Sequence, residues 1–242
     1  MLVNLGKGIS PIAPLKPQLF SPISVNGLAA WYDAADSSTL SVSAGNISQW
    51  EDKSGHLRHV SQSTGSRQPA HDTQNNLVAF NADQYLFSAQ LNFNLQNLTF
   101  FTVGKVRGIS AWGNYVFTQG PDGTFWGLRW NGDAANLKPG FKILGNNNAF
   151  SQAVMLDTDY LIAGRFDNSA DTTEGYVNGV RYLNNISAAG NPGSNNQFFI
   201  GQNNQGLDVH EILIFDRALS DQEINKIGLY LADKWGVSWA NI

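Results

Sequence analysis

Short apolar segments, each about the length of one strand, are separated by clusters of Gly, Asn, Asp and Ser through most of this 242-residue chain. Segments such as LTFFTVGKV, YLIAGRF and QFFIGQ are rich in β-branched and aromatic residues, which suit a pleated, half-buried surface. Only one segment has the pattern of a helix, so the strand–helix alternation of a parallel sheet is missing. We therefore predict an all-β chain, folded as an antiparallel sandwich or barrel.

The clearest local signal is the segment YVNGVRY, which contains the pair Asn178-Gly179. Asn and Gly tolerate the positive φ angles of a type I′ turn, and apolar and aromatic residues stand on both sides of them. This segment predicts a β-hairpin.

The helical segment lies near the C-terminus. Ser220 followed by Glu223 is a capping box, and Leu219 with Ile224 forms the hydrophobic staple around it, so the helix is predicted to begin at Asp221. Its apolar residues recur at spacings of three and four, and Gly236 follows them as a C-terminal cap; they are Ile224, Ile227, Leu231 and Trp235. A helix with one apolar face is expected to lie on the sandwich.

Composition narrows the range of partners. The net charge of −4 and the pI of about 5.5 argue against a nucleic-acid partner or an anionic membrane surface. The chain has no cysteine, so thiol catalysis, thiolate metal sites and disulfides are excluded. No apolar run approaches the ~20 residues of a membrane span, and the N-terminus lacks a secretory signal. We expect synthesis in the cytoplasm.

Residues 1–24 differ from the rest of the chain. They hold four of its eight prolines together with several apolar residues, a composition that disfavours both helix and central strand. We predict an extended N-terminal arm over 1–24, used for attachment or oligomerisation, and one domain over 25–242. A homo-oligomer, with a trimer favoured, is expected to form through the arm.

Five segments, in the order GLAAWYDAADSSTL, ISQWEDKSG, RQPAH, GYVNGV and HEILIFDRALSDQEINKIGLYLADKWGV, resemble the LamG-like jelly rolls of the concanavalin A-like lectin/glucanase superfamily. The resemblance covers about residues 27–237, and its last segment is the most specific. It implies a two-sheet antiparallel jelly-roll sandwich with the short C-terminal helix packed across one end. It also implies that Trp31, Trp50 and Trp235 belong to the core.

Proteins with this combination of features resemble phage virion proteins that touch host glycans. The resemblance implies a lectin-like virion protein, made in the host cytoplasm, that binds host surface polysaccharide and contacts other virion subunits through residues 1–24. One alternative is a purely structural decoration or fibre-base protein without sugar binding. A second is a bacterial surface adhesion domain.

Sugar binding needs an aromatic face and planar polar groups, and the segments SAWGNY and GTFWGLRWNGD supply both. The candidate carbohydrate-binding residues are Trp112, Tyr115, Trp126, Arg129, Trp130, Asn131 and Asp133. Side chains alternate along a strand, so Trp126 and Trp130 share one face, and the alternative is that this face is core.

Glucanases of this superfamily carry paired carboxylates at alternating positions of one strand, where both flank a glycosidic bond. This chain has no E-x-D-x-E run; Glu51 and Asp52 are adjacent, and Asp157 and Asp159 have no glutamate beside them. We therefore expect the chain not to be an enzyme.

Calcium is the one metal for which the sequence offers ligands. Many relatives bind it through loop aspartates, which here would be Asp33, Asp36 and Asp52, or through an acidic residue at the start of a strand, near which Asp208 lies. The alternative is that these aspartates cap turns through their own hydrogen bonds. No other cofactor is expected.

Overall fold

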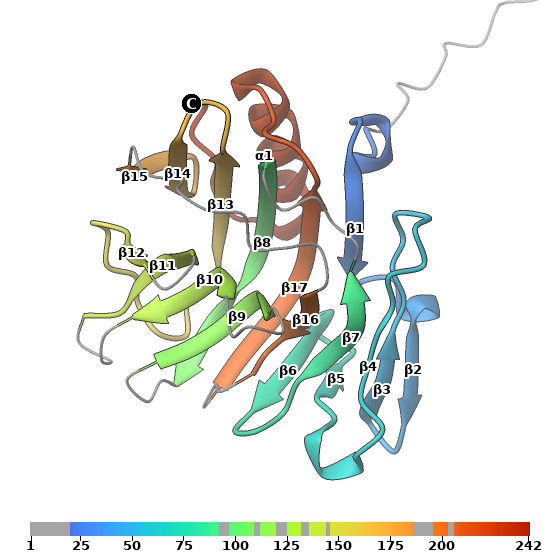
Figure 1. Cartoon of the computed structure of the whole chain (residues 1–242). Coiled ribbons are helices and arrows are strands. Elements are labelled where there is room, and N and C mark those ends of the chain that lie inside the picture. The colour runs from blue at the N-terminus through green and yellow to red at the C-terminus, as the bar shows by residue number, and fades with distance from the viewer. Residues whose placement is uncertain are drawn as a thin grey trace, which may run out of the picture.

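The computed structural model describes residues 20–91, 97–108, 112–119, 125–131, 136–143, 146–185, 196–202 and 206–242. These residues form strands, three short 3-10 helices and one α-helix (Figure 1). The first half of the chain holds η1 (Pro22–Ser24), β1 (Leu28–Asp33), η2 (Ser37–Thr39), β2 (Leu40–Ser43), β3 (Asn46–Trp50), β4 (Val60–Ser61), η3 (Gly65–Arg67), β5 (Ala70–Asp72), β6 (Leu77–Asn81), β7 (Leu86–Leu91), β8 (Asn97–Gly108) and β9 (Trp112–Gln119). The second half holds β10 (Phe125–Asn131), β11 (Lys138–Ile143), β12 (Asn146–Ala149), β13 (Tyr160–Asp167), β14 (Thr172–Val177), β15 (Val180–Asn185), β16 (Asn196–Ile200), β17 (Gly206–Phe215) and α1 (Asp221–Trp235).

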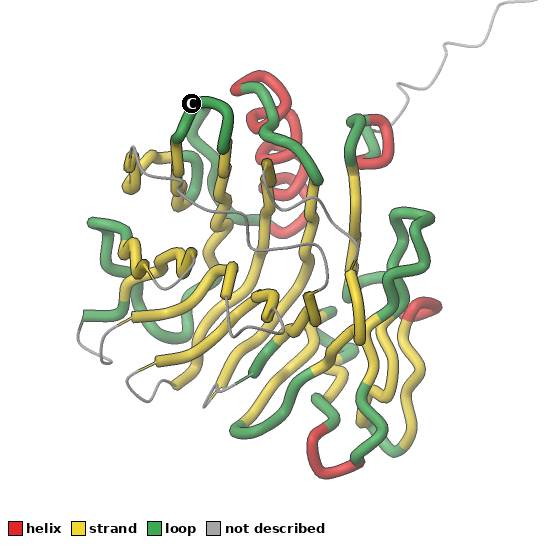
Figure 2. Tube along the Cα trace, in the orientation of Figure 1, coloured by secondary structure: helices red, strands yellow, loops and turns green. Residues whose placement is uncertain are grey.

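The strands form two layers that are joined by hydrogen bonds at one side. One layer has the order β1–β17–β8–β13–β14–β15, and the other has the order β12–β11–β10–β9–β16–β7–β4–β3–β2. Strand β6 pairs with the start of β17 and, through β5, connects the two layers. All pairings among the described strands are antiparallel, and Figure 2 shows the strands in yellow. The predicted antiparallel sandwich is confirmed.

The main core lies between the layers and is dominated by aromatic residues. Tyr32 stacks on Phe198 with ring centroids 5.9 Å apart, and its ring lies 5.7 Å from that of Trp50. All three side chains are fully buried, which removes their large apolar area from water. The prediction that Trp50 belongs to the core is therefore confirmed.

The predicted hairpin joins β14 to β15. Val177 pairs with Val180, and the two turn residues have positive φ angles, 51° at Asn178 and 82° at Gly179. These angles are those of a type I′ turn, which explains why Asn and Gly occupy the two positions.

Helix α1 begins as predicted, with the capping box formed. The Ser220 side chain accepts a hydrogen bond from the Glu223 backbone N–H, and the Glu223 carboxylate accepts one from the Ser220 N–H. Gly236 ends the helix in the left-handed conformation, at φ 67°. The buried face of α1 forms a second core against the outer side of the first layer, with Phe101 and Phe215 beneath it. No helix among the described residues is long and apolar enough to cross a membrane.

A network around one buried carboxylate, here called the Glu211 cluster, fixes the end of α1 to the sheet. Glu211 is fully buried in β17 and accepts hydrogen bonds from Trp31 Nε1 at 2.7 Å, Trp235 Nε1 at 2.6 Å, Tyr230 Oη at 3.2 Å and Lys234 Nζ at 2.7 Å. Burial raises the pKa of Glu211, and Lys234 opposes that rise. Four donors from β1 and α1 thus bind this one carboxylate.

The cluster refines the expectation for two family tryptophans. Trp31 is buried, as predicted, but Trp235 is only partly buried. Its ring lies 4.7 Å from that of His210, and its N–H reaches the Glu211 carboxylate, so its position combines an apolar contact with a polar one.

Both ends of the described chain lie against α1. Phe20 packs edge-on against Tyr230, with ring centroids 5.6 Å apart, while residues 1–19 of the predicted arm lie outside the described residues. Beyond the helix, Trp239 lies against Gly228, where an added Cβ would come within 2.2 Å of the indole ring. The glycine in mid-helix is therefore required by the close approach of Trp239.

Candidate functional site

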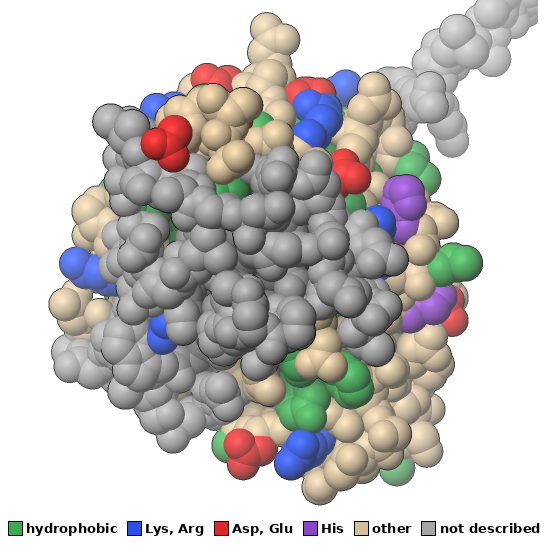
Figure 3. All heavy atoms as spheres, viewed as in Figure 1, with side chains coloured by type: hydrophobic (Ala, Val, Ile, Leu, Met, Phe, Trp, Pro, Cys, Tyr) green, Lys and Arg blue, Asp and Glu red, His purple; other side chains and the backbone are tan. Residues whose placement is uncertain are grey.

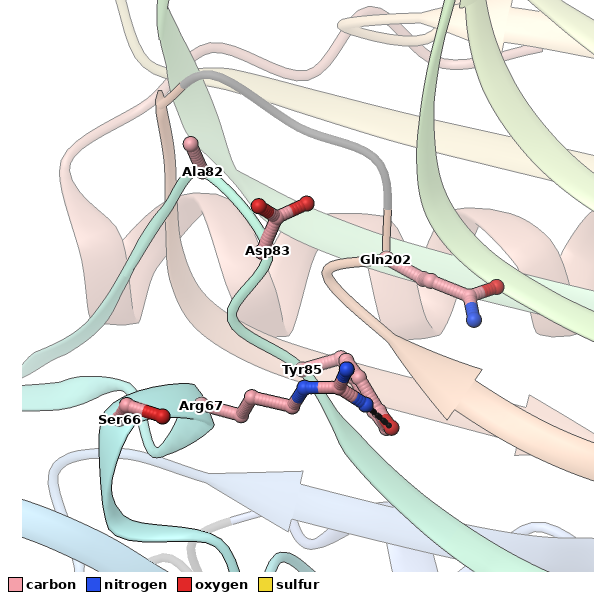
Figure 4. A pocket seen from close by; sticks show the side chains of 6 residues that line it. All are labelled: Ser66, Arg67, Ala82, Asp83, Tyr85 and Gln202. Atoms are coloured by element: carbon pink, nitrogen blue, oxygen red, sulfur yellow. Dashed lines mark hydrogen bonds between the residues drawn. The ribbon is translucent and has the colours of Figure 1, made fainter.

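A group of polar side chains lines a cavity of about 510 Å³, here called the Arg67–Tyr85 pocket. Its lining comes from three separate segments, as Figure 4 shows: η3, the turn between β6 and β7, and the second residue after β16. The lining residues are Ser66, Arg67, Ala82, Asp83, Tyr85 and Gln202.

Backbone hydrogen bonds hold two of these segments together. The Tyr85 N–H donates to the Arg67 carbonyl at 3.1 Å, and the Arg67 N–H donates to the Thr64 carbonyl at 2.9 Å. The position of η3 beside the start of β7 is therefore set by the backbone and not by side chains alone.

Arg67 and Tyr85 form a fixed pair on one wall. Arg67 Nη1 donates to Tyr85 Oη at 3.0 Å, drawn as a dashed line in Figure 4, and the guanidinium carbon lies 5.7 Å from the ring centroid. The Tyr85 ring rests on Phe87 and Phe199, at centroid distances of 6.0 and 5.9 Å. This wall thus offers an ordered aromatic ring beside an exposed guanidinium.

Asp83 stands on a different wall, in the β6–β7 turn. Its φ of 63° is left-handed, a conformation that Asp and Asn adopt more readily than most residues. The turn is closed by a hydrogen bond from Gln84 N to the Asn81 carbonyl at 3.1 Å and by one from Asn81 N to Gln84 Oε1 at 2.8 Å. In Figure 4 the Asp83 carboxylate lies apart from Arg67, and neither residue has an ion-pair partner among the described residues.

The structure corrects part of the predicted carbohydrate site. Tyr115 and Trp130 are each 1% exposed, and their rings lie 6.0 Å apart in the core between the layers, together with Leu128. Neither ring is available to a ligand at the surface. The alternating pattern did not decide which face of β10 is buried, and in the structure the face that holds Leu128 and Trp130 lies in the core.

The remaining predicted sugar-binding residues have other positions. Arg129 lies between two core-facing residues of β10, so its side chain leaves the strand on the opposite face; it is buried, and burial lowers its pKa. Trp112, Trp126 and Asn131 lie in strands β9 and β10, but their side chains are outside the described part of the structure, as is all of Asp133. For these four residues sugar binding stays a prediction.

The predicted calcium ligands have other partners in the structure, beginning with Asp33 and Asp36. Lys53 Nζ lies 2.8 Å from Asp33 Oδ2 and 2.8 Å from Asp36 Oδ2, and Lys234 Nζ lies 2.8 Å from Asp33 Oδ1. Hydrogen bonds from Lys53 and Ser38 lower the pKa of Asp36. Lysine ammonium groups therefore contact carboxylate oxygens that the calcium prediction needed as ligands.

The other two candidates are also occupied. Asp52 Oδ1 accepts hydrogen bonds from the backbone N–H groups of Trp31 at 2.9 Å and Ser54 at 2.8 Å, which makes it a turn cap. Asp208 Oδ1 pairs with Arg107 Nε at 2.7 Å. No group of three or more His, Asp or Glu side chains within the described ranges could hold a metal ion.

A second cavity, of about 540 Å³, lies beside the first turn of α1, but its charges are paired. Arg165 contacts Glu174 and Asp221, and Arg217 binds the Glu223 carboxylate through both terminal nitrogens, at 3.0 and 2.5 Å. These charges stabilise the helix start and leave little capacity for a ligand. The Arg67–Tyr85 pocket is therefore the better candidate site.

Sequence reasoning missed the Arg67–Tyr85 pocket completely. Its residues come from three segments that have no common motif, and long-range contacts bring them together: the Tyr85–Arg67 hydrogen bonds and the pairing of β7 with β16. The one local signal is the polar turn NADQ between two apolar strands, which predicts a turn but no ligand.

Comparison with known proteins identifies the fold. The family model described as the concanavalin A-like lectin/glucanases superfamily matches residues 80–225. The chain belongs to this superfamily. The matched segment runs from the end of β6 into α1, so it includes most strands of both layers of the superfamily fold. No curated protein matches the chain.

Solved structures that align with this chain include sialidases, an arabinofuranosidase and a pentraxin. A Trypanosoma rangeli sialidase in complex with sialic acid aligns with a TM-score of 0.63 and 14% identity, over 87% of this chain and 33% of the sialidase. A SAP-like pentraxin from Limulus polyphemus aligns with a TM-score of 0.53 and 13% identity, over 63% of this chain and 81% of the pentraxin. An α-L-arabinofuranosidase mutant soaked with 4-nitrophenyl α-L-arabinofuranoside aligns with a TM-score of 0.55 and 12% identity, over 77% of this chain and 50% of the enzyme. This chain thus spans about a third of the length of the sialidases that it matches.

These structures overturn the expectation that the chain is not an enzyme. Sialidases and an arabinofuranosidase share the fold, so membership of the superfamily is compatible with enzymatic activity. The absence of an E-x-D-x-E run excludes only the arrangement in which the catalytic carboxylates lie on one strand. The carboxylates of a site can also come from distant segments of a jelly roll. At 12–15% identity these similarities show the fold alone.

Proposed function

We propose that this chain is a carbohydrate-binding jelly roll and that the Arg67–Tyr85 pocket binds the glycan. The observation that carries this proposal is the combination of an ordered, partly exposed aromatic ring with a guanidinium, a carboxylate, an amide and a hydroxyl around one open cavity. These side chains come from Tyr85, Arg67, Asp83, Gln202 and Ser66.

Sugars have the complementary surface. The C–H groups of a pyranose ring pack on an aromatic face, while its hydroxyls both donate and accept hydrogen bonds. Asp83 accepts only, Arg67 donates only, and Gln202 does both, so the pocket contains a partner for each kind of hydroxyl contact. The superfamily and the sugar-bound sialidase of the same fold support this proposal.

We extend the proposal to a biological role as a phage virion protein that contacts host surface polysaccharide. Support comes from the resemblance of the combined segments, of which HEILIFDRALSDQEINKIGLYLADKWGV is the most specific, to LamG-like jelly rolls of the kind found in such proteins. In this proposal residues 1–24 attach the jelly roll to other virion subunits and favour a trimer. Several linked copies would raise avidity for a repeating glycan even where each pocket binds weakly.

Binding of the full-length protein to host cells and to purified surface polysaccharide tests the proposal. We expect saturable binding that Tyr85→Ala abolishes and that Leu229→Ala retains, because Leu229 is an exposed residue of α1 and does not line the pocket. Circular dichroism of both variants checks that they are folded. Equal binding by both variants, or no binding by the wild type, would favour a structural virion role.

A further inference from the structure

The Arg67–Tyr85 pocket contains two opposite charges that do not neutralise each other. Arg67 and Asp83 line the same cavity, yet no N–O distance between them falls within 4.0 Å, and both side chains are exposed. Three other described arginines, Arg107, Arg165 and Arg217, each form an ion pair with a carboxylate. The separation of charges is therefore a particular property of this pocket.

Both charges are held in place by their own segments. The hydrogen bond from Arg67 Nη1 to Tyr85 Oη uses one of five guanidinium N–H groups and leaves the others for a ligand. Asp83 is fixed by the closed β6–β7 turn, whose hydrogen bonds set its left-handed backbone. A ligand thus meets an acceptor and a donor that are already positioned apart, which lowers the entropy cost of binding.

We infer that this pocket selects a neutral, hydroxyl-rich sugar unit rather than an acidic one. The inference rests on the proposed glycan binding and names the class of glycan. A hydroxyl group donates to Asp83 while another on the same ring accepts from Arg67, so one neutral ring satisfies both walls. A uronic acid or sialic acid gains an ion pair at Arg67, but it brings a second carboxylate into the cavity that holds Asp83, and like charges repel.

Asp83→Asn is the decisive variant because it removes the charge and keeps the shape. Asn also tolerates a φ of 63°, so the β6–β7 turn is expected to stay intact. Asp233→Asn is the matched control, since it makes the same change of charge at an exposed residue of α1 that does not line the pocket.

The experiment is calorimetric titration of the full chain with two sets of oligosaccharides of equal length. One set contains neutral glucose, galactose and mannose oligomers, and the other contains glucuronic and galacturonic acid oligomers. We expect the wild type to bind a neutral oligomer more tightly than any acidic one. Asp83→Asn should weaken neutral binding about tenfold, the range expected for a hydrogen bond to a charged group, and should reduce the preference for neutral over acidic oligomers.

The outcomes separate the inference from the function on which it rests. If the wild type binds acidic oligomers more tightly than neutral ones, the selectivity is wrong and glycan binding stands. Equal effects of Asp83→Asn and Asp233→Asn would overturn the role of Asp83 in the same way. If the wild type binds no oligomer of either set and no host polysaccharide, both the proposed function and the inference fail.

Discussion

The Glu211 cluster and the Arg67–Tyr85 pocket contain similar groups, carboxylate, cation and aromatic ring, and use them in opposite ways. In the Glu211 cluster the carboxylate is fully buried and receives four donors, two of them indole N–H groups. In the Arg67–Tyr85 pocket the carboxylate of Asp83 and the guanidinium of Arg67 stand apart and exposed.

The difference shows how to separate structural from functional polar residues in this fold. A buried charge is stable only when every partner is present, so a saturated cluster holds elements together and has nothing left to offer a ligand. Exposed charges cost little to leave unpaired, and the groups that a pocket leaves open are those that a ligand completes.

The largest effect is expected for Glu211→Ala. Removal of the carboxylate leaves two indole N–H groups without their acceptor beneath α1 and leaves Lys234 paired with Asp33 alone. Loss of one side of a buried ion pair typically costs about 3–5 kcal/mol. Urea denaturation should show this loss in the free energy of unfolding. Glycan affinity, measured where the variant is still folded, should equal that of the wild type; a change in affinity would mean that the two regions are coupled.

A smaller effect is expected for Tyr85→Phe, and it should fall on glycan affinity rather than on stability. The variant keeps the ring and its packing on Phe87 and Phe199 but removes the oxygen that orders Arg67, so stability should change by less than about 0.5 kcal/mol. Glycan binding should weaken by about 1 kcal/mol, or about fivefold in Kd. Titration calorimetry and thermal unfolding of the same sample measure both quantities, and unchanged affinity would show that the Arg67 position does not matter.

The start of α1 offers a pH test of a carboxylate whose partners are all within the protein, like that of Glu211. Arg217, together with hydrogen bonds from Ser220, lowers the pKa of Glu223 to about 2 from its usual 4.5. The unfolded state therefore binds more protons in this window, so the contribution of Glu223 is complete above about pH 4.5 and is lost as the pH falls through about 2.

Because the pair is about one-third exposed, the loss should be less than about 1 kcal/mol. Urea denaturation from about pH 5 to about pH 2 measures it. The part of the pH dependence due to this pair should be missing in Glu223→Gln and unchanged in Asp233→Asn. An identical pH profile for wild type and Glu223→Gln would contradict the assignment.

The smallest effect is expected from calcium. Because Lys53 and Lys234 already bind the oxygens of Asp33 and Asp36, added calcium or EDTA should not act through these residues on the thermal midpoint. A calcium-dependent shift that Asp36→Asn or Asp208→Asn removes would show that a metal ion displaces the side-chain cations. A shift that both variants retain would locate calcium binding elsewhere in the chain.

The sequence predicted those features that depend on neighbouring residues. The turn at Asn178-Gly179 and the capping box of Ser220 and Glu223 each lie within a few positions, so their chemistry is visible in a short segment. The alternation along β10 predicted that Trp126 and Trp130 share a face, but alternation does not tell which face is core. That choice depends on the opposite layer, and it placed Trp130 inside.

The candidate site could not be predicted in this way. Arg67 meets Tyr85 across a chain separation of 18 residues, and Gln202 joins them because β16 pairs with β7. Likewise, Asp33 looked like a metal ligand because the sequence does not show that Lys53 and Lys234 reach it. Partners supplied by distant strands decide whether a polar residue is saturated or open.

The position of β17 in the sheet has a consequence for how the chain folds. Its ten residues are all buried, and it pairs with β1, β6 and β8; in the described structure it is the partner of β1, and 180 residues separate Trp31 from its hydrogen-bond acceptor Glu211. During synthesis the earlier strands emerge with unpaired edges and wait for β17. Such distant pairings slow folding and expose strand edges to association, so the sheet is expected to be completed late in folding, when β17 joins β1 and β8.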